Sequence, residues 1–177
     1  YGIDILKPTI LITFHPETIE FEENKNYVEE LISALRELNN YQQIITMPNA
    51  DTMGIVIRTK LLEYAQDKPN VFCVESFGSL GYLSCMKYCI FMLGNTSSGF
   101  VEAAFFCKPV VNIGMRQKGR IETPNIVTVP ILKNDILKGV SLALAQKINA
   151  TSCQIYGSGK AAEQIVKILK SKYNEYV

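Results

Sequence analysis

The sequence predicts an α/β fold, in which a mainly parallel β-sheet carries helices on both faces. Short runs of β-branched and aromatic residues alternate with longer amphipathic stretches along the whole chain. Small or polar residues follow each run, as expected where parallel strands end at one edge of a sheet. No repeat, low-complexity segment or linker interrupts the pattern, so we expect a single domain over residues 1–177.

The strands are predicted from short apolar runs bounded by polar or small residues. Thr9–Phe14 (TILITF) and Cys89–Leu93 (CIFML) are the most apolar of these runs, which is typical of strands buried on both faces. The six predicted strands, in order, are residues 9–14, 43–47, 71–74, 89–93, 110–113 and 126–129.

The helices are predicted from apolar residues at intervals of three and four. In Tyr27–Leu38, for example, Val28, Leu31 and Leu35 fall on one helical stripe. The six predicted helices, in order, are residues 27–38, 54–66, 79–86, 98–106, 135–148 and 160–173. Strands that alternate with helices in this way imply right-handed crossovers between parallel strands.

Composition excludes several classes of protein. A hydrophobic fraction of 47% is too high for a disordered chain, and 177 residues can bury a core without disulfide or metal support. The net charge of +1 argues against a nucleic-acid-binding domain. No apolar run approaches the length of a membrane span, and no signal peptide is visible.

Cysteine usage indicates a reducing, cytoplasmic compartment. The five cysteines are odd in number and scattered, mostly in apolar surroundings. One histidine and the lack of a CxxC pair argue against a zinc site, so we expect no metal.

The segment Leu93–Phe106 (LGNTSSGFVEAAFF) is the strongest candidate site. Its small residues, between a strand and a helix, let a ligand approach the backbone, and the first N–H groups of the helix suit a phosphate. Thr96, Ser97 and Ser98 add hydroxyls, and Glu102 can accept hydrogen bonds from a ribose diol. A plain serine N-cap after an asparagine turn is an equally good interpretation. Neither GxGxxG nor GxxxxGK[ST] is present.

A basic segment, Asn112–Arg120 (NIGMRQKGR), follows the fifth predicted strand. Arg116, Lys118 and Arg120 lie within five positions and can reach an anionic ligand from a loop. Taken alone, the segment also fits a solvated basic loop. Its place at the same sheet edge as residues 96–99, hereafter the Ser-rich turn, favours the ligand interpretation.

Three further candidates follow other strands. His15, the only histidine, can donate to a phosphate or carry a proton, although a lone histidine is often merely packed. Phe77 can offer its ring or backbone amide to a flat base, and Asn49 follows a neighbouring strand; either can instead cap a helix. The glycine-rich segment Tyr156–Lys160 lacks a preceding strand and is predicted to be a turn into the last helix.

The order of five segments resembles that of the hydrolysing UDP-N-acetylglucosamine 2-epimerases. The segments are ITFHPET, MPNAD, GNTSSGFVEAAFF, KPVVNIGMRQKGR and IYGSGKAAEQIVKIL, so the resemblance covers nearly the whole chain. Members of that family have two Rossmann-like domains in the glycosyltransferase-B arrangement, with the active site between them. The resemblance implies that this chain is the C-terminal, UDP-binding half, a three-layer sandwich, and that an N-terminal domain is its partner.

The resemblance also implies roles for the Ser-rich turn. Thr96 and Ser97 match the residues that bind the diphosphate at the helix N-terminus, and Ser98 and Gly99 of the same turn are expected to bind UDP with them. Glu102 matches the residue that holds the ribose hydroxyls.

The remaining matches lie after other strands. Arg116 resembles the family's diphosphate arginine, and Phe77 the residue that meets uracil through backbone groups. His15 resembles the histidine of the family's HP motif, a candidate catalytic residue near the phosphates and sugar, and Asn49 the asparagine that lines the cleft. The chain departs from the family pattern at Thr96, where Ser is common, and at Glu17, where Val is frequent.

The function that the resemblance implies is conversion of UDP-N-acetylglucosamine to N-acetylmannosamine and UDP, for sialic- or legionaminic-type sugars. UDP leaves by anti-elimination to a 2-acetamidoglucal, which is then hydrated with inversion at C2. No cofactor is expected. The acidic residues that move the C2 proton lie mainly in the first domain, so we expect the isolated chain to bind UDP without turnover and the full-length enzyme to form a homo-oligomer.

Three alternatives remain open. The first is a non-hydrolysing epimerase or an epimerase of a diacetamido-sugar nucleotide, and the second is the donor domain of a glycosyltransferase. The third is a non-catalytic nucleotide-binding module. Neither nucleic acid nor a membrane is expected as a partner.

Overall fold

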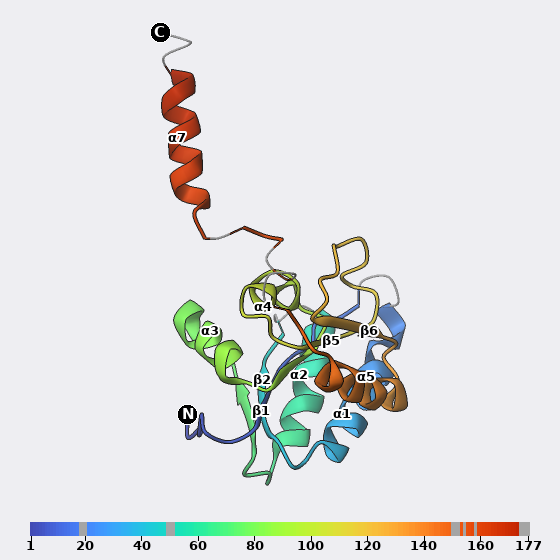
Figure 1. Ribbon diagram of the computed structural model, residues 1–177. Coiled ribbons are helices and arrows are strands. Elements are labelled where there is room, and N and C mark those ends of the chain that lie inside the picture. The colour runs from blue at the N-terminus through green and yellow to red at the C-terminus, as the bar shows by residue number, and fades with distance from the viewer. Residues whose placement is uncertain (18–20, 49–51, 150–152, 154, 158, 174–177) are drawn as a thin grey trace.

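The computed structural model describes residues 1–17, 21–48, 52–149, 153, 155–157 and 159–173 and contains a six-stranded, wholly parallel sheet. The strand order is β3-β2-β1-β4-β5-β6 (Figure 1). Strands β2 and β3 are added on one side of β1 and strands β4 to β6 on the other, so the strand order reverses between β1 and β4. The strands are β1 (Thr9–Thr13), β2 (Gln42–Thr46), β3 (Val71–Val74), β4 (Phe91–Gly94), β5 (Val110–Ile113) and β6 (Ile126–Val129). All six predicted strands are confirmed, with small shifts at their ends.

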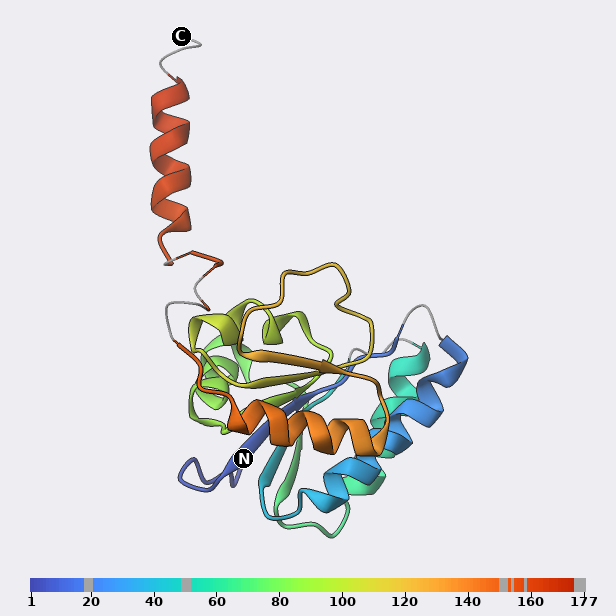
Figure 2. The same cartoon turned by 45° about the vertical axis from the view of Figure 1, so that its right-hand side comes forward.

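The first face of the sheet is covered by α1 (Asn24–Glu37), α2 (Thr52–Ala65) and α5 (Lys133–Ala145). Figure 2 shows α5 and α1 lying along this face. Their apolar stripes meet the central strands in the larger core cluster, where Ile12, Leu31 and Leu35 are completely buried. The helical spacing seen in the sequence therefore does place one face of each helix on the sheet.

The opposite face carries α3 (Gly78–Tyr88) and the short α4 (Glu102–Phe105). A second core cluster lies here, in which Leu11, Met86 and Phe100 are almost fully buried. The sheet is thus packed on both sides, which confirms the predicted three-layer arrangement.

The predicted single helix over residues 98–106 is wrong. The segment forms a 3-10 turn at Ser97–Gly99 and then only one turn of α-helix, α4. The connection must bury Phe100 and return to the sheet within a few residues, and the chain leaves helical geometry at Cys107, whose φ is +48°. The predicted strand start at Cys89 is also wrong, because Cys89 instead caps α3.

The last helix, α7 (Ala161–Tyr173), is confirmed and stands away from the sheet in both views (Figures 1 and 2). Its apolar side chains, among them Ile165 and Leu169, are exposed. In the described part of the chain, no helix is both long and apolar enough to cross a membrane.

Candidate functional site

The candidate site lies where the strand order reverses, at the carboxyl ends of β1 and β4. Thr13 of β1 pairs with Gly94 of β4, so the segments that follow these two strands emerge side by side. In open parallel sheets, the crevice outside this reversal point is where ligands bind. One of these segments contains His15, and the other contains the Ser-rich turn; the site residues predicted from both segments therefore lie at the same edge.

Gly94 allows the Ser-rich turn to leave the sheet at this point. Its φ is +144°, and a Cβ built on it would lie 1.9 Å from the carbonyl oxygen of Thr13. Only a residue without a side chain fits both the backbone angle and the space.

The Ser-rich turn is held by its own hydrogen bonds. The Thr96 hydroxyl accepts from the amide of Ser98 at 3.4 Å, the Thr96 carbonyl accepts from Gly99, and the Ser97 carbonyl accepts from Phe100. Thr96, Ser97 and Ser98 are half-buried, and Gly99 is buried. Because these amides already have partners within the turn, the groups it leaves for an anion are mainly the hydroxyls, rather than the helix N-terminus that the sequence predicts.

Arg116 and Ser97, predicted from separate segments, line one cavity of about 620 Å³. Residues 116–120 form the rest of its lining, so Arg116, Lys118 and Arg120 all border it, with no acidic side chain among the lining residues. The tertiary structure therefore brings the hydroxyls and the basic loop together. Such a cavity is suited to a multiply charged anion such as a diphosphate.

His15 is tied to the Ser-rich turn through its backbone. Its amide donates to Asn95 Oδ1 at 2.7 Å, and its carbonyl accepts from Asn95 Nδ2 at 2.8 Å. The His15 side chain is half-buried at the same sheet edge. Its predicted nearness to the turn is thus borne out by the geometry, and its chemical role stays a prediction.

Phe77 ends the segment after β3 and precedes α3, on the same face as α4. Its half-buried ring packs edge-on against Tyr1, with centroids 4.9 Å apart, and joins the second core cluster. Because the ring is used in packing, its backbone groups remain the candidate contacts to a base. Asn49, the other predicted residue of this kind, lies outside the described residues.

Glu102 is exposed at the first position of α4. Close beside this segment, the hydroxyl of Tyr82 is buried near Ser98 and Thr13 and meets no partner with hydrogen-bonding geometry among the described residues. Burial raises the pKa of Tyr82, the neighbouring Ser98 and Thr13 hydroxyls oppose this rise, and the carboxylate of Glu102 adds to it. Tyr82 was not predicted as a site residue, because nothing in the sequence indicates that the hydroxyl of this helical tyrosine lies buried near the Ser-rich turn.

A buried polar cluster beneath the site was also missed. It consists of Glu17, Asn24, Asn95 and Gln117, each at most 5% exposed. In the sequence, Glu17 stood out only as a departure from the family pattern. Burial of these side chains depends on contacts between residues up to 99 positions apart, which local pattern cannot reveal.

Two cysteines can be excluded as nucleophiles. Burial raises the pKa of Cys89 to about 12 and that of Cys73 to about 11. Both thiols are therefore protonated at neutral pH, whereas the reactive form is the thiolate. In the described residues, no three His, Cys, Asp or Glu side chains gather as metal ligands would.

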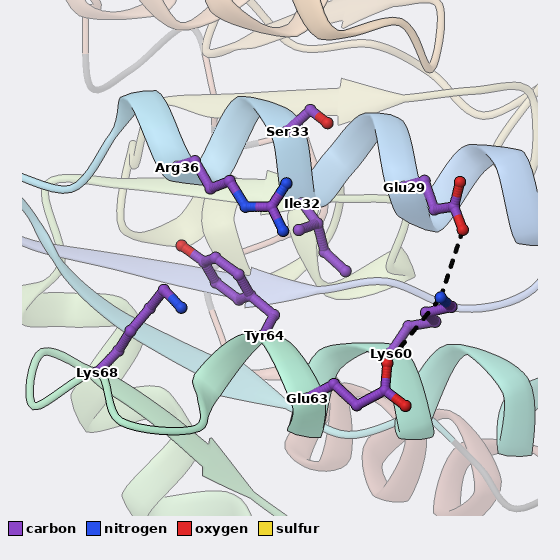
Figure 3. A pocket seen from close by; sticks show the side chains of 8 residues that line it. All are labelled: Glu29, Ile32, Ser33, Arg36, Lys60, Glu63, Tyr64 and Lys68. Carbon is purple, nitrogen blue, oxygen red and sulfur yellow. Dashed lines mark ion pairs between the residues drawn. The ribbon is translucent and has the colours of Figure 1, made fainter.

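A smaller pocket of about 320 Å³ lies between α1 and α2 (Figure 3). Its charged groups serve the packing of the two helices: Lys60 pairs with Glu29 and Glu63, and Lys68 lies over the ring of Tyr64. The Tyr64 hydroxyl is bonded to Gln43. The pocket lies towards the C-terminal ends of α1 and α2. Both helices run from the carboxyl edge of the sheet back towards its amino edge, so the pocket is separate from the candidate site.

Comparison with known proteins identifies the family. The family model described as UDP-N-acetylglucosamine 2-epimerase matches residues 4–170. A UDP-N,N'-diacetylbacillosamine 2-epimerase (hydrolyzing) of Legionella pneumophila is 36% identical over 97% of this chain and 45% of its own length. A GDP/UDP-N,N'-diacetylbacillosamine 2-epimerase (hydrolyzing) of Campylobacter jejuni is 41% identical over 73% of this chain and 34% of its own length.

Solved structures agree on the fold. The UDP-GlcNAc 2-epimerase of Methanocaldococcus jannaschii, in complex with UDP-GlcNAc and UDP, superposes with a TM-score of 0.71 at 21% identity. The match covers 92% of this chain and 45% of that one, which confirms the predicted Rossmann-like fold. The chain spans less than half the length of these relatives. By the match of its sequence over residues 4–170, the chain belongs to the UDP-N-acetylglucosamine 2-epimerase family.

Proposed function

We propose that residues 1–177 are the C-terminal, UDP-binding domain of a hydrolysing UDP-N-acetylglucosamine 2-epimerase. The observation that carries this proposal is the cavity in which Ser97 meets the basic loop of Arg116, Lys118 and Arg120. Family membership supports the same conclusion, and the relatives' greater length supports a further domain in the whole protein.

In this proposal, the domain binds the part of the substrate that leaves. The C1–O bond breaks, its electron pair moves to the β-phosphate oxygen of UDP, and the C2 proton is lost, which leaves a 2-acetamidoglucal. Water then adds its hydroxyl to C1 and a proton to C2 from the face that inverts this carbon. The proton-transfer groups at C2 are expected from the rest of the protein.

The contribution of the domain to the rate is electrostatic. Negative charge builds on the diphosphate as the C1–O bond breaks, so fixed positive groups bind the transition state more tightly than the ground state. Arg116 supplies such a group at the cavity, the hydroxyls of the Ser-rich turn add neutral hydrogen-bond donors, and a protonated His15 adds positive charge at the same edge.

The base and the ribose are assigned to neighbouring segments. Phe77 meets uracil through its backbone, because its ring packs on Tyr1. Glu102, exposed at the start of α4, accepts hydrogen bonds from the ribose hydroxyls. Asn49 stays a proposal drawn from the family resemblance.

Arg116→Ala tests the proposal. Loss of a charged hydrogen bond to the diphosphate should weaken UDP binding by about 1–3 kcal/mol, measured by titration calorimetry. Arg36→Ala, which removes an arginine from the pocket between α1 and α2, is the matched control and should leave the affinity unchanged. Equal UDP affinity in the Arg116→Ala variant and the wild type would contradict the assignment.

A second candidate substrate is a UDP-linked diacetamido sugar. It is favoured by the two relatives at 36% and 41% identity, whose names give diacetylbacillosamine as the sugar. Mass spectrometry of the sugar released by the full-length protein from each nucleotide sugar separates the two candidates. A free sugar among the products also separates hydrolysing from non-hydrolysing chemistry.

The proposal includes a cytoplasmic location and a homo-oligomeric full-length enzyme. A reducing compartment is supported by the odd number and scattered placement of the five cysteines. Sedimentation of the full-length protein tests the oligomeric state.

A further inference from the structure

We propose that Glu17 is a positioning residue of the UDP site, which sets the place of Arg116 by holding the backbone of residues 114–116. The inference rests on the proposed function, because it explains how the Arg116 cavity is built. Glu17 itself lies beneath the loop and acts through Arg116, not on the ligand.

Three donors converge on one oxygen of the buried Glu17 carboxylate. Its Oε1 accepts from the backbone amides of Met115 and Arg116, each at 3.2 Å, and from Asn95 Nδ2 at 3.4 Å. Glu17 is only 4% exposed, so its charge would be costly without these partners.

Gly114 is shaped to close over this carboxylate. Its φ is +81°, and a Cβ built on it would lie 2.4 Å from Glu17 Oε1 and 2.7 Å from Ile131 Cδ1. A side chain at this φ is disfavoured, and an added Cβ would force the ends of the Glu17 and Ile131 side chains to shift. The close approach agrees with the hydrogen bonds in placing the loop directly against Glu17.

Glu17 is itself held in place by side-chain amides. Asn24, at the start of α1, accepts from the Glu17 amide at 2.7 Å and donates to its carbonyl at 2.9 Å. Asn95 forms the same pair of bonds with the backbone of His15. The backbone after β1 is therefore hydrogen-bonded by side-chain amides at both His15 and Glu17. These bonds fix the position from which the Glu17 carboxylate contacts the loop.

The far side of Arg116 is anchored as well. Gln117 Nε2 donates to the Asn95 carbonyl at 2.8 Å, and Gln117 Oε1 accepts from Arg120 Nε at 2.7 Å. Arg116 thus lies between two buried anchors while its own side chain is exposed at the cavity. A backbone fixed in advance reduces the ordering cost of binding.

Three substitutions of Glu17 distinguish the effect of its side-chain length from the effect of its charge. Glu17→Gln keeps an oxygen acceptor at the same reach, Glu17→Asp keeps the charge but shortens the side chain, and Glu17→Met removes the acceptor. Because side-chain length is expected to decide, Gln should stay close to wild type, and Asp and Met should both weaken UDP binding by about tenfold for a lost hydrogen bond. Weakening by Gln as large as that by Asp would contradict this.

Hydrogen exchange in the protein without ligand tests the loop directly. The amides of Met115 and Arg116 should be protected in the wild type and in Glu17→Gln, and should exchange at least about tenfold faster in Glu17→Asp. This readout does not involve UDP, so it decides the positioning role even if the proposed function fails. Equal exchange rates in the wild type and in Glu17→Asp would overturn the inference.

A double-mutant cycle tests whether the effect passes through Arg116. Glu17→Asp should weaken UDP binding about tenfold in the wild type, but less than about twofold when Arg116 is already alanine. Equal factors in both backgrounds would overturn the inference, because Glu17 would then act on the fold in general. Calorimetry at matched temperature measures all four proteins.

Asn125→Leu is the control for general destabilisation. Asn125 is as buried as Asn95, and its Nδ2 donates to the Lys108 carbonyl at 2.8 Å, but at the amino ends of β5 and β6. It should lower the melting temperature and leave both UDP affinity and loop exchange unchanged. If Asn125→Leu also exposed the Met115 amide, the special role of Glu17 would be refuted. If Glu17→Met does not fold, Glu17→Asp carries the test.

Discussion

Gly94 is the residue at which the candidate site depends most directly on backbone geometry. Gly94→Ala would combine a φ of +144° with a Cβ 1.9 Å from the Thr13 carbonyl oxygen. Backbone strain and overpacking together should lower the free energy of unfolding by at least about 3 kcal/mol. Urea denaturation of the purified chain measures this.

Gly119→Ala is the matched control, because Gly119 also has a positive φ, +92°, but nothing within 4 Å of a built Cβ. Its cost should be limited to backbone strain, about 1–3 kcal/mol, and smaller than that of Gly94→Ala. If the two variants were equally stable, the close approach of β1 and β4 would not be what makes Gly94 necessary.

At the residue scale, the residues that line the cavity could be predicted from the sequence. The buried residues that hold their backbone in place could not. Ser97 and Arg116 stood out because hydroxyls and cations follow strands, and both do line the same cavity. Glu17 and Asn95 did not stand out as a pair, because a buried carboxylate and amide look like surface residues in a sequence. Their role follows only from partners distant in the chain.

At the element scale, the strands were the most predictable part. Strands buried on both faces must be continuously apolar, so runs such as TILIT in β1 are recognisable without any structure. The helix predicted over residues 98–106 failed, because its apolar spacing does serve the second core cluster but in two short pieces. Spacing predicts which residues are buried better than it predicts one unbroken helix.

The last helix, α7, provides a prediction at this scale. Its apolar residues Ile165, Ile168 and Leu169 are all more than half exposed, so α7 contributes little buried area to this domain. Deleting residues 161–177 should change the free energy of unfolding by less than about 1 kcal/mol, as for surface changes. A calorimetric melting curve checks this, and a drop of several degrees would show that α7 packs on the domain in solution.

At the scale of the whole molecule, we expect the isolated chain to bind UDP without turning over UDP-N-acetylglucosamine. The reason is that the chain spans less than half of its relatives, and the proton-transfer groups at C2 are expected elsewhere. Calorimetry with UDP and chromatography of the sugar products measure both halves of this expectation. Measurable epimerisation by residues 1–177 alone would contradict it.

The sequence by itself determined the α/β class, the order of the elements, the family, and which polar residues follow which strand, because these depend on local spacing and residue type. The tertiary structure decided which of those residues meet. Only the strand order, with β1 beside β4, brings His15, Ser97 and Arg116 to one edge, and only burial of Glu17 beneath the loop explains how Arg116 is held there. Such contacts join residues about 100 positions apart, and their energies depend on packing that no local pattern records.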